Sequence, residues 1–273
     1  MWGMQGNHIH DLFDLKGRVA FVTGGARNLG YDMALALAEA GADVALTSRT
    51  PAGAESAGAA IGKATGRRVL PMELEVTDEA EAAAVVDRIL AEFGRLDILV
   101  NNAGNVVSTP ENAPMEKRPS ELWQQTIDVN LNGVFYCSKH TVAKAMKPRQ
   151  SGVIVNIGST AGIIGKDRRM YAGTTMGGAT LDYHAAKGAV VNMTRDMAVY
   201  LAPDNIRVNC ISPGGFERGQ AANFIDAYSE TVPMRRMGVD RKEMKGAVVF
   251  LASEASSYIT GHNLVVDGGL SAW

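Results

Sequence analysis

The sequence predicts a doubly wound α/β fold, in which helices cover both faces of a seven-stranded parallel sheet. Short β-branched runs alternate along the chain with Ala-rich segments of helical length. This alternation is typical of strand–helix–strand units with parallel, buried strands. The 273 residues are 46% hydrophobic, which is the composition of a globular protein able to bury a large core.

The expected elements follow one another along almost the whole chain. Strands are expected over Val19 to Thr23, Val44 to Thr47, Val69 to Met72, Ile98 to Asn101, Val153 to Ile157, Arg207 to Ile211 and Leu264 to Val266. Helices are expected over Leu29 to Ala40, Ala52 to Ala64, Asp78 to Phe93, Ser120 to Met146, Tyr183 to Leu201 and Arg241 to Ala252. No linker divides them, so we expect one domain over residues 15–273 after a loose N-terminal arm, residues 1–14.

Composition excludes several classes of partner. The net charge of −2 gives no electrostatic case for nucleic-acid binding. Apolar runs are too short for a membrane span, and no targeting segment is readable, so a cytoplasmic location is expected. Cys137 and Cys210 are too few for a disulfide framework, and the five histidines show no ligand spacing. We therefore expect no metal site.

A glycine-rich turn over residues 23–30 lies between the first expected strand and the first helix. Small residues let the backbone approach a phosphate, and the helix N-terminus favours an anion. A nucleotide triphosphate loop is excluded, because Tyr31 stands where Gly25 and Gly30 would require a Lys. The remaining interpretations are a dinucleotide site and a tight turn without a ligand.

The second strand ends in Ser48 and Arg49 and offers no carboxylate. At this place in a dinucleotide-binding fold, a carboxylate selects the free 2′-hydroxyl of NAD and an Arg accommodates the 2′-phosphate of NADP. Arg49 and Arg27 predict NADP(H) as the preferred cofactor over NAD(H). The alternative is that Arg49 is a solvated surface residue.

Four polar side chains form a candidate catalytic group. Tyr183 and Lys187 are four residues apart and share one face of a helix. Ser159 follows the fifth expected strand, and Asn130 lies within the long helix before it. These groups could converge on the reactive end of a cofactor.

At these residues the chain resembles the short-chain dehydrogenase/reductase family, which has a single Rossmann-like domain. The resemblance covers nearly the whole chain in family order, from the glycine-rich turn to Pro213 and Gly214. It also implies a homotetramer. Together with the two Arg residues it gives this set of expected cofactor-binding residues: Gly24, Arg27, Asn28, Leu29, Gly30, Ser48, Arg49, Glu75, Val76, Asn102, Ala103, Gly104, Tyr183, Lys187, Pro213, Gly214 and Phe216.

The resemblance also implies the catalytic roles. Tyr183 would donate or accept the proton, Lys187 would lower its pKa and bind the nicotinamide ribose, Ser159 would hold the substrate oxygen, and Asn130 would anchor a water. A free Tyr titrates near pH ~10, and a neighbouring ammonium favours the tyrosinate, so this chemistry fits the residue types. Tyr171 is a competing candidate because it lies 12 residues after Ser159, the separation usual in the family.

Residue 175 decides between the two tyrosines, because it is Thr where a Lys is needed four residues after Tyr171. With Tyr183 as the choice, residues 160–182 include an insertion, too long for an ordinary loop after a strand. Lys166, Arg168 and Arg169 make it cationic. We expect it to form part of a lid that favours an anionic carbonyl compound such as a sugar acid. The alternative is a solvated surface loop or a subunit contact.

Three positions depart from the family pattern. Asn28 replaces a glycine of the turn, but Asn tolerates a left-handed backbone. Glu75 stands where a shorter Asp or Asn usually lies near the adenine, so an adenine contact is expected but not established. Arg218 replaces a usual Thr, and either it or the backbone at Gly215 and Phe216 would contact the cofactor.

The sequence thus predicts an NADP(H)-dependent oxidoreductase that interconverts a carbonyl compound and a secondary alcohol. One alternative is an NAD-linked polyol or sugar-acid dehydrogenase. Another is a non-catalytic dinucleotide sensor, which would have no use for the four polar groups together. A serine hydrolase is disfavoured, because Ile157 occupies a required Gly position near Ser159. A small molecule is the expected partner in each enzymatic case.

Overall fold

The computed structural model describes residues 8–106, 115–171, 173–174, 178 and 180–273. Of the expected N-terminal arm, residues 8–14 are described and include the short 3-10 helix η1 (Asp11–Phe13). Residues 1–7 of the arm, and residue 175 of the inserted segment, lie outside the described residues.

The core of the molecule is a seven-stranded parallel sheet, which confirms the predicted fold class. Its strand order is β3-β2-β1-β4-β5-β6-β9. The strands are β1 (Val19–Val22), β2 (Asp43–Ser48), β3 (Val69–Glu73), β4 (Ile98–Asn101), β5 (Gly152–Ile157), β6 (Ile206–Pro213) and β9 (Asn263–Val266). The order reverses between β1 and β4, and ligands of open parallel sheets bind at such a switch point, beyond the carboxyl ends of the strands.

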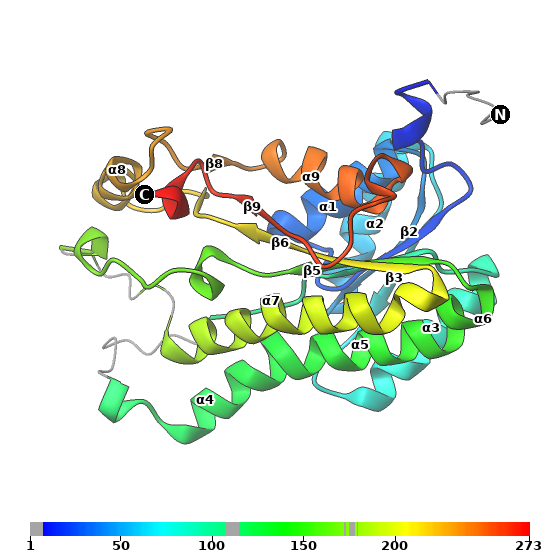
Figure 1. Cartoon of the computed structure of the whole chain (residues 1–273), viewed down its shortest axis with the longest axis horizontal. Helices are drawn as coiled ribbons and strands as arrows, with labels where there is room; N and C mark the ends of the chain where they lie inside the picture. The colour runs from blue at the N-terminus through cyan, green and yellow to red at the C-terminus, as the bar shows by residue number, and fades with distance from the viewer. Residues whose placement is uncertain (1–7, 107–114, 172, 175–177, 179) are drawn as a thin grey trace.

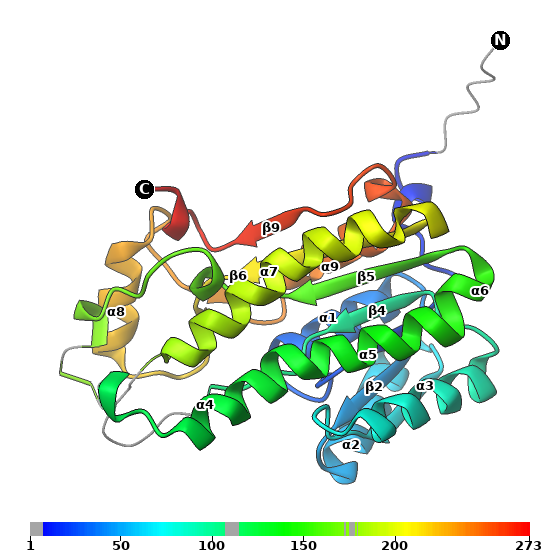
Figure 2. The same cartoon turned by 60° about the horizontal axis from the view of Figure 1, so that its bottom comes forward.

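Helices cover the two faces of this sheet in two layers (Figure 1). One layer holds α1 (Asn28–Glu39), α2 (Pro51–Thr65) and α9 (Glu243–Ala252). The other holds α3 (Glu79–Phe93), α4 (Ser120–Ile127), α5 (Gly133–Thr141), α6 (Lys147–Arg149) and α7 (Leu181–Leu201). In Figure 2, α4, α5 and α7 cross the near face of the sheet side by side.

Each layer buries its own apolar cluster against the sheet. Met33 and Leu37 of α1 pack with Val248 of α9 on one side, and all three side chains are fully buried. Val86 and Ile89 of α3 belong to the cluster on the other side. Because both faces are covered, the central strands are mostly apolar, and all four residues of β1 are buried.

The helix expected over Ser120 to Met146 is present, but it contains two π-helical turns that the sequence analysis did not predict. They are η3 (Asp128–Asn132), between α4 and α5, and η4 (Val142–Met146), between α5 and α6. A π-helical turn contains one more residue than an α-helical turn. The residues that flank these two turns keep right-handed helical dihedral angles, so the spacing of apolar residues in the sequence does not reveal the additional residue.

A further helix and a small sheet were missed. They are α8 (Ala222–Thr231) and the parallel pair β7 (Phe216–Glu217) and β8 (Gly238–Val239). Figure 2 shows α8 beyond the carboxyl ends of the strands, next to the inserted segment. Phe224 and Tyr228 of α8 form a third buried cluster with Met170 of that segment.

Candidate active site

A cavity of about 670 Å³ lies at the carboxyl ends of the strands, at the switch point between β1 and β4. All the expected cofactor-binding residues line it except Gly214 and Phe216. Its lining also includes Ala26, Thr47, Thr50, Gly53, Leu74, Asn105, Val106, Val129, Ile157, Gly158 and Arg218. One cavity therefore brings the glycine-rich turn and the Tyr183 helix together.

The turn after β1 has the bare backbone that a phosphate requires. A Cβ added to Gly30 would lie 2.2 Å from Gly24 O and 2.4 Å from Asn102 Nδ2, so only glycine fits there. Gly24 has φ +62° and Asn28 has φ +52°, both in the left-handed region. Asn adopts the left-handed region more readily than most other residues, so Asn28 can take the place of the family's glycine in this turn.

The segment after β4 is tied to this turn by hydrogen bonds. Asn102 Nδ2 donates to Thr23 O at 2.9 Å and to Gly24 O at 3.1 Å. In return, Thr23 Oγ1 accepts from the backbone N of Asn102 and of Ala103, each at 3.0 Å. The two loops that border the switch point thus hold each other, and the cavity floor is preformed.

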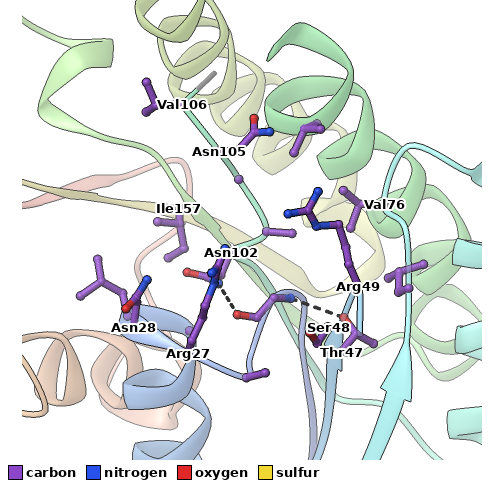
Figure 3. A pocket seen from close by; sticks show the side chains of 18 of the residues that line it. Arg27, Asn28, Thr47, Ser48, Arg49, Val76, Asn102, Asn105, Val106 and Ile157 are labelled. Atoms are coloured by element: carbon purple, nitrogen blue, oxygen red, sulfur yellow. Dashed lines mark hydrogen bonds between the residues drawn. The ribbon is translucent and has the colours of Figure 1, made fainter. Parts of the chain in front are cut away.

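Arg27 and Arg49 reach the cavity from two different segments, as Figure 3 shows. Both side chains are exposed. Neither has an ion pair or a side-chain hydrogen bond to any described residue, and both remain available to an anion. Among the described residues of the lining, Glu75 is the only acidic one, and its Oε1 accepts a hydrogen bond from Thr77 N at 3.3 Å.

Tyr183 lines the cavity, and its hydroxyl is close enough to Ser159 for a hydrogen bond. Ser159 Oγ also accepts from Ala161 N at 3.1 Å, which fixes the serine at the end of β5. The Lys187 Nζ lies 5.6 Å from the centre of the Tyr183 ring. The structure therefore brings these three predicted residues together.

Lys187 is buried and donates from Nζ to Ile157 O at 2.8 Å. A Cβ added to Gly104 would lie 2.8 Å from Asn130 Oδ1 and 3.5 Å from Lys187 Nζ. Gly104 thus lets the Asn130 amide and the Lys187 ammonium approach the same point from two helices.

Asn130 occupies the middle of the π-helical turn η3 and is fully buried. Its Nδ2 donates to Asn105 O at 2.8 Å and to Thr126 O at 2.9 Å. Its Oδ1 has no hydrogen-bond partner within the described part of the chain, and neither Asn130 nor Ser159 is among the residues that line the cavity. π-helical turns are common where a helix must present a functional side chain in this way.

The pKa values of Tyr183 and Lys187 are both shifted by burial. Burial raises the pKa of the Tyr183 hydroxyl above its ordinary value, and this outweighs the lowering by Ser159. Burial also lowers the pKa of Lys187 to about 8. Both groups lie where charge is poorly solvated, and the lowering of the Tyr183 pKa expected from Lys187 together with an oxidised nicotinamide ring stays a prediction for the cofactor-bound protein.

The segment after β6 contributes differently from what was expected. Pro213 and Arg218 line the cavity, and Arg218 Nε donates to both carboxylate oxygens of Asp240 at 2.9 Å. Gly214 and Phe216 do not line it. The Phe216 ring is buried in the cluster under α1 and α9, so this residue supports the wall from behind.

The described residues of the inserted segment do not line the cavity. Lys166 Nζ lies over the Tyr171 ring, 4.1 Å from its centre, and Arg169 pairs with Asp167 at 2.7 Å on the surface. Tyr171 packs against Phe224 of α8. The competing tyrosine therefore packs on α8 rather than in the cavity lining, and the lid stays a prediction, since residues 172, 175–177 and 179 of the segment lie outside the described residues.

Sequence reasoning missed Asn105 and Val106, which extend the Asn102 to Gly104 motif along the cavity wall. Their position directly after that motif is the signal that could have identified them. The described residues contain no group of three or more His, Cys, Asp or Glu side chains placed to hold a metal ion. None of the described helices combines the length and apolar character needed to traverse a bilayer.

Comparison with known proteins agrees with this geometry. A family model described as enoyl-(acyl carrier protein) reductase matches residues 24–271. The cis-4-hydroxycyclohexanecarboxylate dehydrogenase of Sinomonas cyclohexanicum is 38% identical over 93% of this chain and 97% of its own.

Two solved structures are also similar. A short-chain type dehydrogenase/reductase from Mycobacterium marinum has 35% identity and a TM-score of 0.86, over 96% of this chain and 99% of its own. A gluconate 5-dehydrogenase from Burkholderia cenocepacia, solved with NADP and tartrate, has 33% identity and a TM-score of 0.86, over 97% of this chain and 100% of its own. The chain belongs to the short-chain dehydrogenase/reductase family, whose enzymes interconvert alcohols and carbonyl compounds.

Proposed function

We propose that the protein uses NADP(H) to interconvert a carbonyl group and a secondary alcohol on a small molecule that carries a carboxylate. The observation on which this proposal depends is the cavity itself. It joins a backbone cradle fit for phosphates, at Gly24 and Gly30, to the proton-transfer pair Tyr183 and Lys187.

The residues present fit a phosphorylated dinucleotide. Among the described residues that line the cavity, one side chain is acidic, Glu75, and four are cationic. The cationic residues are Arg27, Arg49, Lys187 and Arg218. Arg27 and Arg49 are the residues we assign to the 2′-phosphate of NADP, because charge-assisted bonds from guanidinium groups are among the strongest that a phosphate makes. The related gluconate 5-dehydrogenase was solved with NADP.

The cofactor supplies or accepts the hydride when bound. In reduction, Tyr183 donates its phenolic proton to the substrate oxygen while Ser159 donates a hydrogen bond to the same oxygen. In oxidation, Tyr183 takes the proton back. Lys187 binds the ribose next to the reacting carbon, and Asn130 Oδ1 holds the water through which Tyr183 is reprotonated.

The raised pKa of Tyr183 supports proton donation in this scheme. A phenol that is harder to ionise than usual stays protonated at neutral pH, which is the form needed to reduce a carbonyl. Binding of an oxidised, positively charged nicotinamide ring would favour the tyrosinate, which is the form needed for oxidation.

Arg218 supports a carboxylate-bearing substrate. It is a cation at the cavity wall, where its Nε donates to both carboxylate oxygens of Asp240, and its other guanidinium nitrogens would bind the carboxylate of a substrate. The relatives reported above include enzymes named for cis-4-hydroxycyclohexanecarboxylate and gluconate, both of which are carboxylates. We therefore assign the substrate to the hydroxy acids and oxo acids.

The proposal is tested by reduction of 5-keto-D-gluconate, 4-oxocyclohexanecarboxylate and cyclohexanone, followed at 340 nm with NADPH or NADH. We expect the highest kcat/KM for an oxo acid with NADPH. Tyr183→Phe should lower kcat by about 10² to 10⁴ and leave NADPH binding nearly unchanged. A preference for cyclohexanone would refute the substrate class, and NADPH binding without turnover of any carbonyl would favour the sensor.

Arg49→Asp tests the cofactor assignment separately. Removal of the guanidinium should raise the KM for NADPH far more than the KM for NADH, because only NADPH carries the 2′-phosphate. Equal changes for both cofactors would show that Arg49 is a solvated surface residue.

A further inference from the structure

Arg118 and Asp182 form a buried ion pair close to the catalytic helix. Arg118 Nη2 donates to Asp182 Oδ2 at 2.6 Å, and the side chains are only 8% and 0% exposed. The sequence separates them by 64 residues, and neither lines the cavity. Most surface ion pairs contribute little, but a buried pair that loses one partner leaves an unsolvated charge.

The pair holds the first turn of α7. Asp182 is the second residue of this helix, and the next residue is Tyr183. Arg118 comes from the segment directly before α4, so the ion pair ties the start of α7 to the start of α4. A negative charge in the first helical turn is also favourable there, because the helix N-terminus is the positive end of its dipole.

The same carboxylate is linked to Asn130. The side chain of Thr126, on α4, faces the Asp182 carboxyl, and Thr126 O accepts a hydrogen bond from Asn130 Nδ2 at 2.9 Å. Burial works to raise the pKa of Asp182, but Thr126, Thr180 and Arg118 together lower it below its usual value. Asp182 is therefore a carboxylate held from three sides between the helices that carry Tyr183 and Asn130.

We propose that the Arg118–Asp182 pair is a positioning device that sets the Tyr183 hydroxyl and the Asn130 amide in register across the cavity. This inference rests on the proton-transfer roles proposed for those two residues. Both members act through other residues and touch neither substrate nor cofactor. Small displacements of reacting groups are sufficient to slow a reaction by about 10²-fold, so the pair controls kcat rather than cofactor binding.

The test compares a charge-free variant with a conservative one. Arg118→Met/Asp182→Leu removes the tether without leaving a buried unpaired charge, so the protein remains folded. Arg118→Lys keeps the charge but loses the forked geometry. Hydrogen–deuterium exchange is measured for peptides that cover residues 126–132 and 181–187. NADPH binding is followed by fluorescence, and turnover is measured with 5-keto-D-gluconate and 4-oxocyclohexanecarboxylate.

Asp97→Asn serves as the matched control. Asp97 is also a buried carboxylate held by arginines, at 2.7 Å from Arg95 and 3.1 Å from Arg149, but it directly precedes β4, at the amino ends of the strands and away from the cavity. The Asp97→Asn variant should have a lower melting temperature, with hydrogen–deuterium exchange in residues 126–132 and 181–187 and kcat unchanged.

In the charge-free variant we expect exchange at least tenfold faster in both segments, kcat about 10²-fold lower and a Kd for NADPH within twofold of wild type. Arg118→Lys should recover part of the loss. Wild-type exchange in both segments, or equal effects of Asp97→Asn, would overturn the inference. The exchange result stands even if the wild-type protein reduces neither oxo acid, an outcome that would refute the proposed function alone.

Discussion

The environment of Lys187 links catalysis to stability at the scale of a single residue. Its Nζ is buried, and its hydrogen bond goes to a neutral carbonyl, Ile157 O, rather than to a carboxylate. A buried ammonium without a counter-ion is costly, which is why its pKa is lowered to about 8. The site therefore holds a charge that a phosphorylated, anionic cofactor would help to satisfy.

This environment predicts how stability depends on pH. The folded protein releases the Lys187 proton near pH 8, whereas the unfolded chain keeps it until about pH 10.5. Between these two pH values the unfolded state binds more protons than the folded state, so the free energy of unfolding rises with pH. Below about pH 8 the folded protein bears the full cost of burying the charged ammonium. Urea unfolding should show that the free energy of unfolding of wild type increases from pH 7 to pH 10 by on the order of 2 kcal/mol more than that of Lys187→Met.

The comparison with Lys187→Met removes the contribution of every other titrating group. If the two unfolding free energies run parallel from pH 7 to pH 10, the ammonium is not destabilised by its burial. Saturating NADPH should reduce the difference in wild type, because the ribose hydroxyls would accept further hydrogen bonds from the buried ammonium.

That Tyr183, Lys187 and Ser159 lie together could be predicted from the sequence, but their burial and pKa values could not. Tyr183, Lys187 and Ser159 are recognisable because short spacings place them on one helical face and at a strand end. The pKa of Tyr183 depends on burial by segments far away in the chain. The Arg118–Asp182 contact likewise joins distant residues, and neither carries a local pattern that indicates a partner.

At the scale of elements, two insertions into the regular alternation shape the site. The π-helical turn η3 places Asn130 behind the cavity wall, where its Nδ2 donates to Asn105 O. The inserted segment instead packs on α8, where Met170 is buried and Arg169 is 91% exposed at its side chain. The extra chain after β5 thus adds to the cluster on α8, and its described cations do not line the cavity.

This arrangement predicts opposite results for two sets of Arg variants. Arg168→Ala/Arg169→Ala should leave kcat/KM for 5-keto-D-gluconate within twofold, because neither guanidinium lines the cavity. Arg218→Ala should raise the KM for this oxo acid or for NADPH by about tenfold, the loss expected for one charge-assisted hydrogen bond. A large effect of the first variant with none of the second would restore the lid hypothesis.

The elements themselves were predictable where local pattern and tertiary structure agree. All seven strands of the main sheet were expected, because short apolar runs recur between segments of helical length, although the edge strands β3 and β9 are only partly buried. Helix α8 was missed although Phe224 and Tyr228 have helical spacing, because one pair of residues four apart is too short a stripe to establish a helical period. Strands β7 and β8 have two residues each, too few to give any period.

At the scale of the whole molecule, the layer formed by α5 and α7 presents apolar side chains to solvent. Phe135 on α5 is 51% exposed, and Val199 and Tyr200 at the end of α7 are 78% and 67% exposed. These helices lie next to each other on one face of the sheet (Figure 2). Exposed apolar side chains are common at subunit interfaces, and the tetramer that the family resemblance implies stays a prediction that this layer would serve.

The tetramer is tested by placing charge on this layer. We expect wild type to sediment as four chains in analytical ultracentrifugation. Phe135→Lys/Val199→Lys should sediment as smaller species, because a symmetric interface brings each new ammonium out of water and near its copy. Ile9→Lys, at a residue 57% exposed in the N-terminal arm, serves as the control and should leave the mass unchanged. A monomeric wild type, or a charged variant that remains a tetramer, would show that this layer does not pair between subunits.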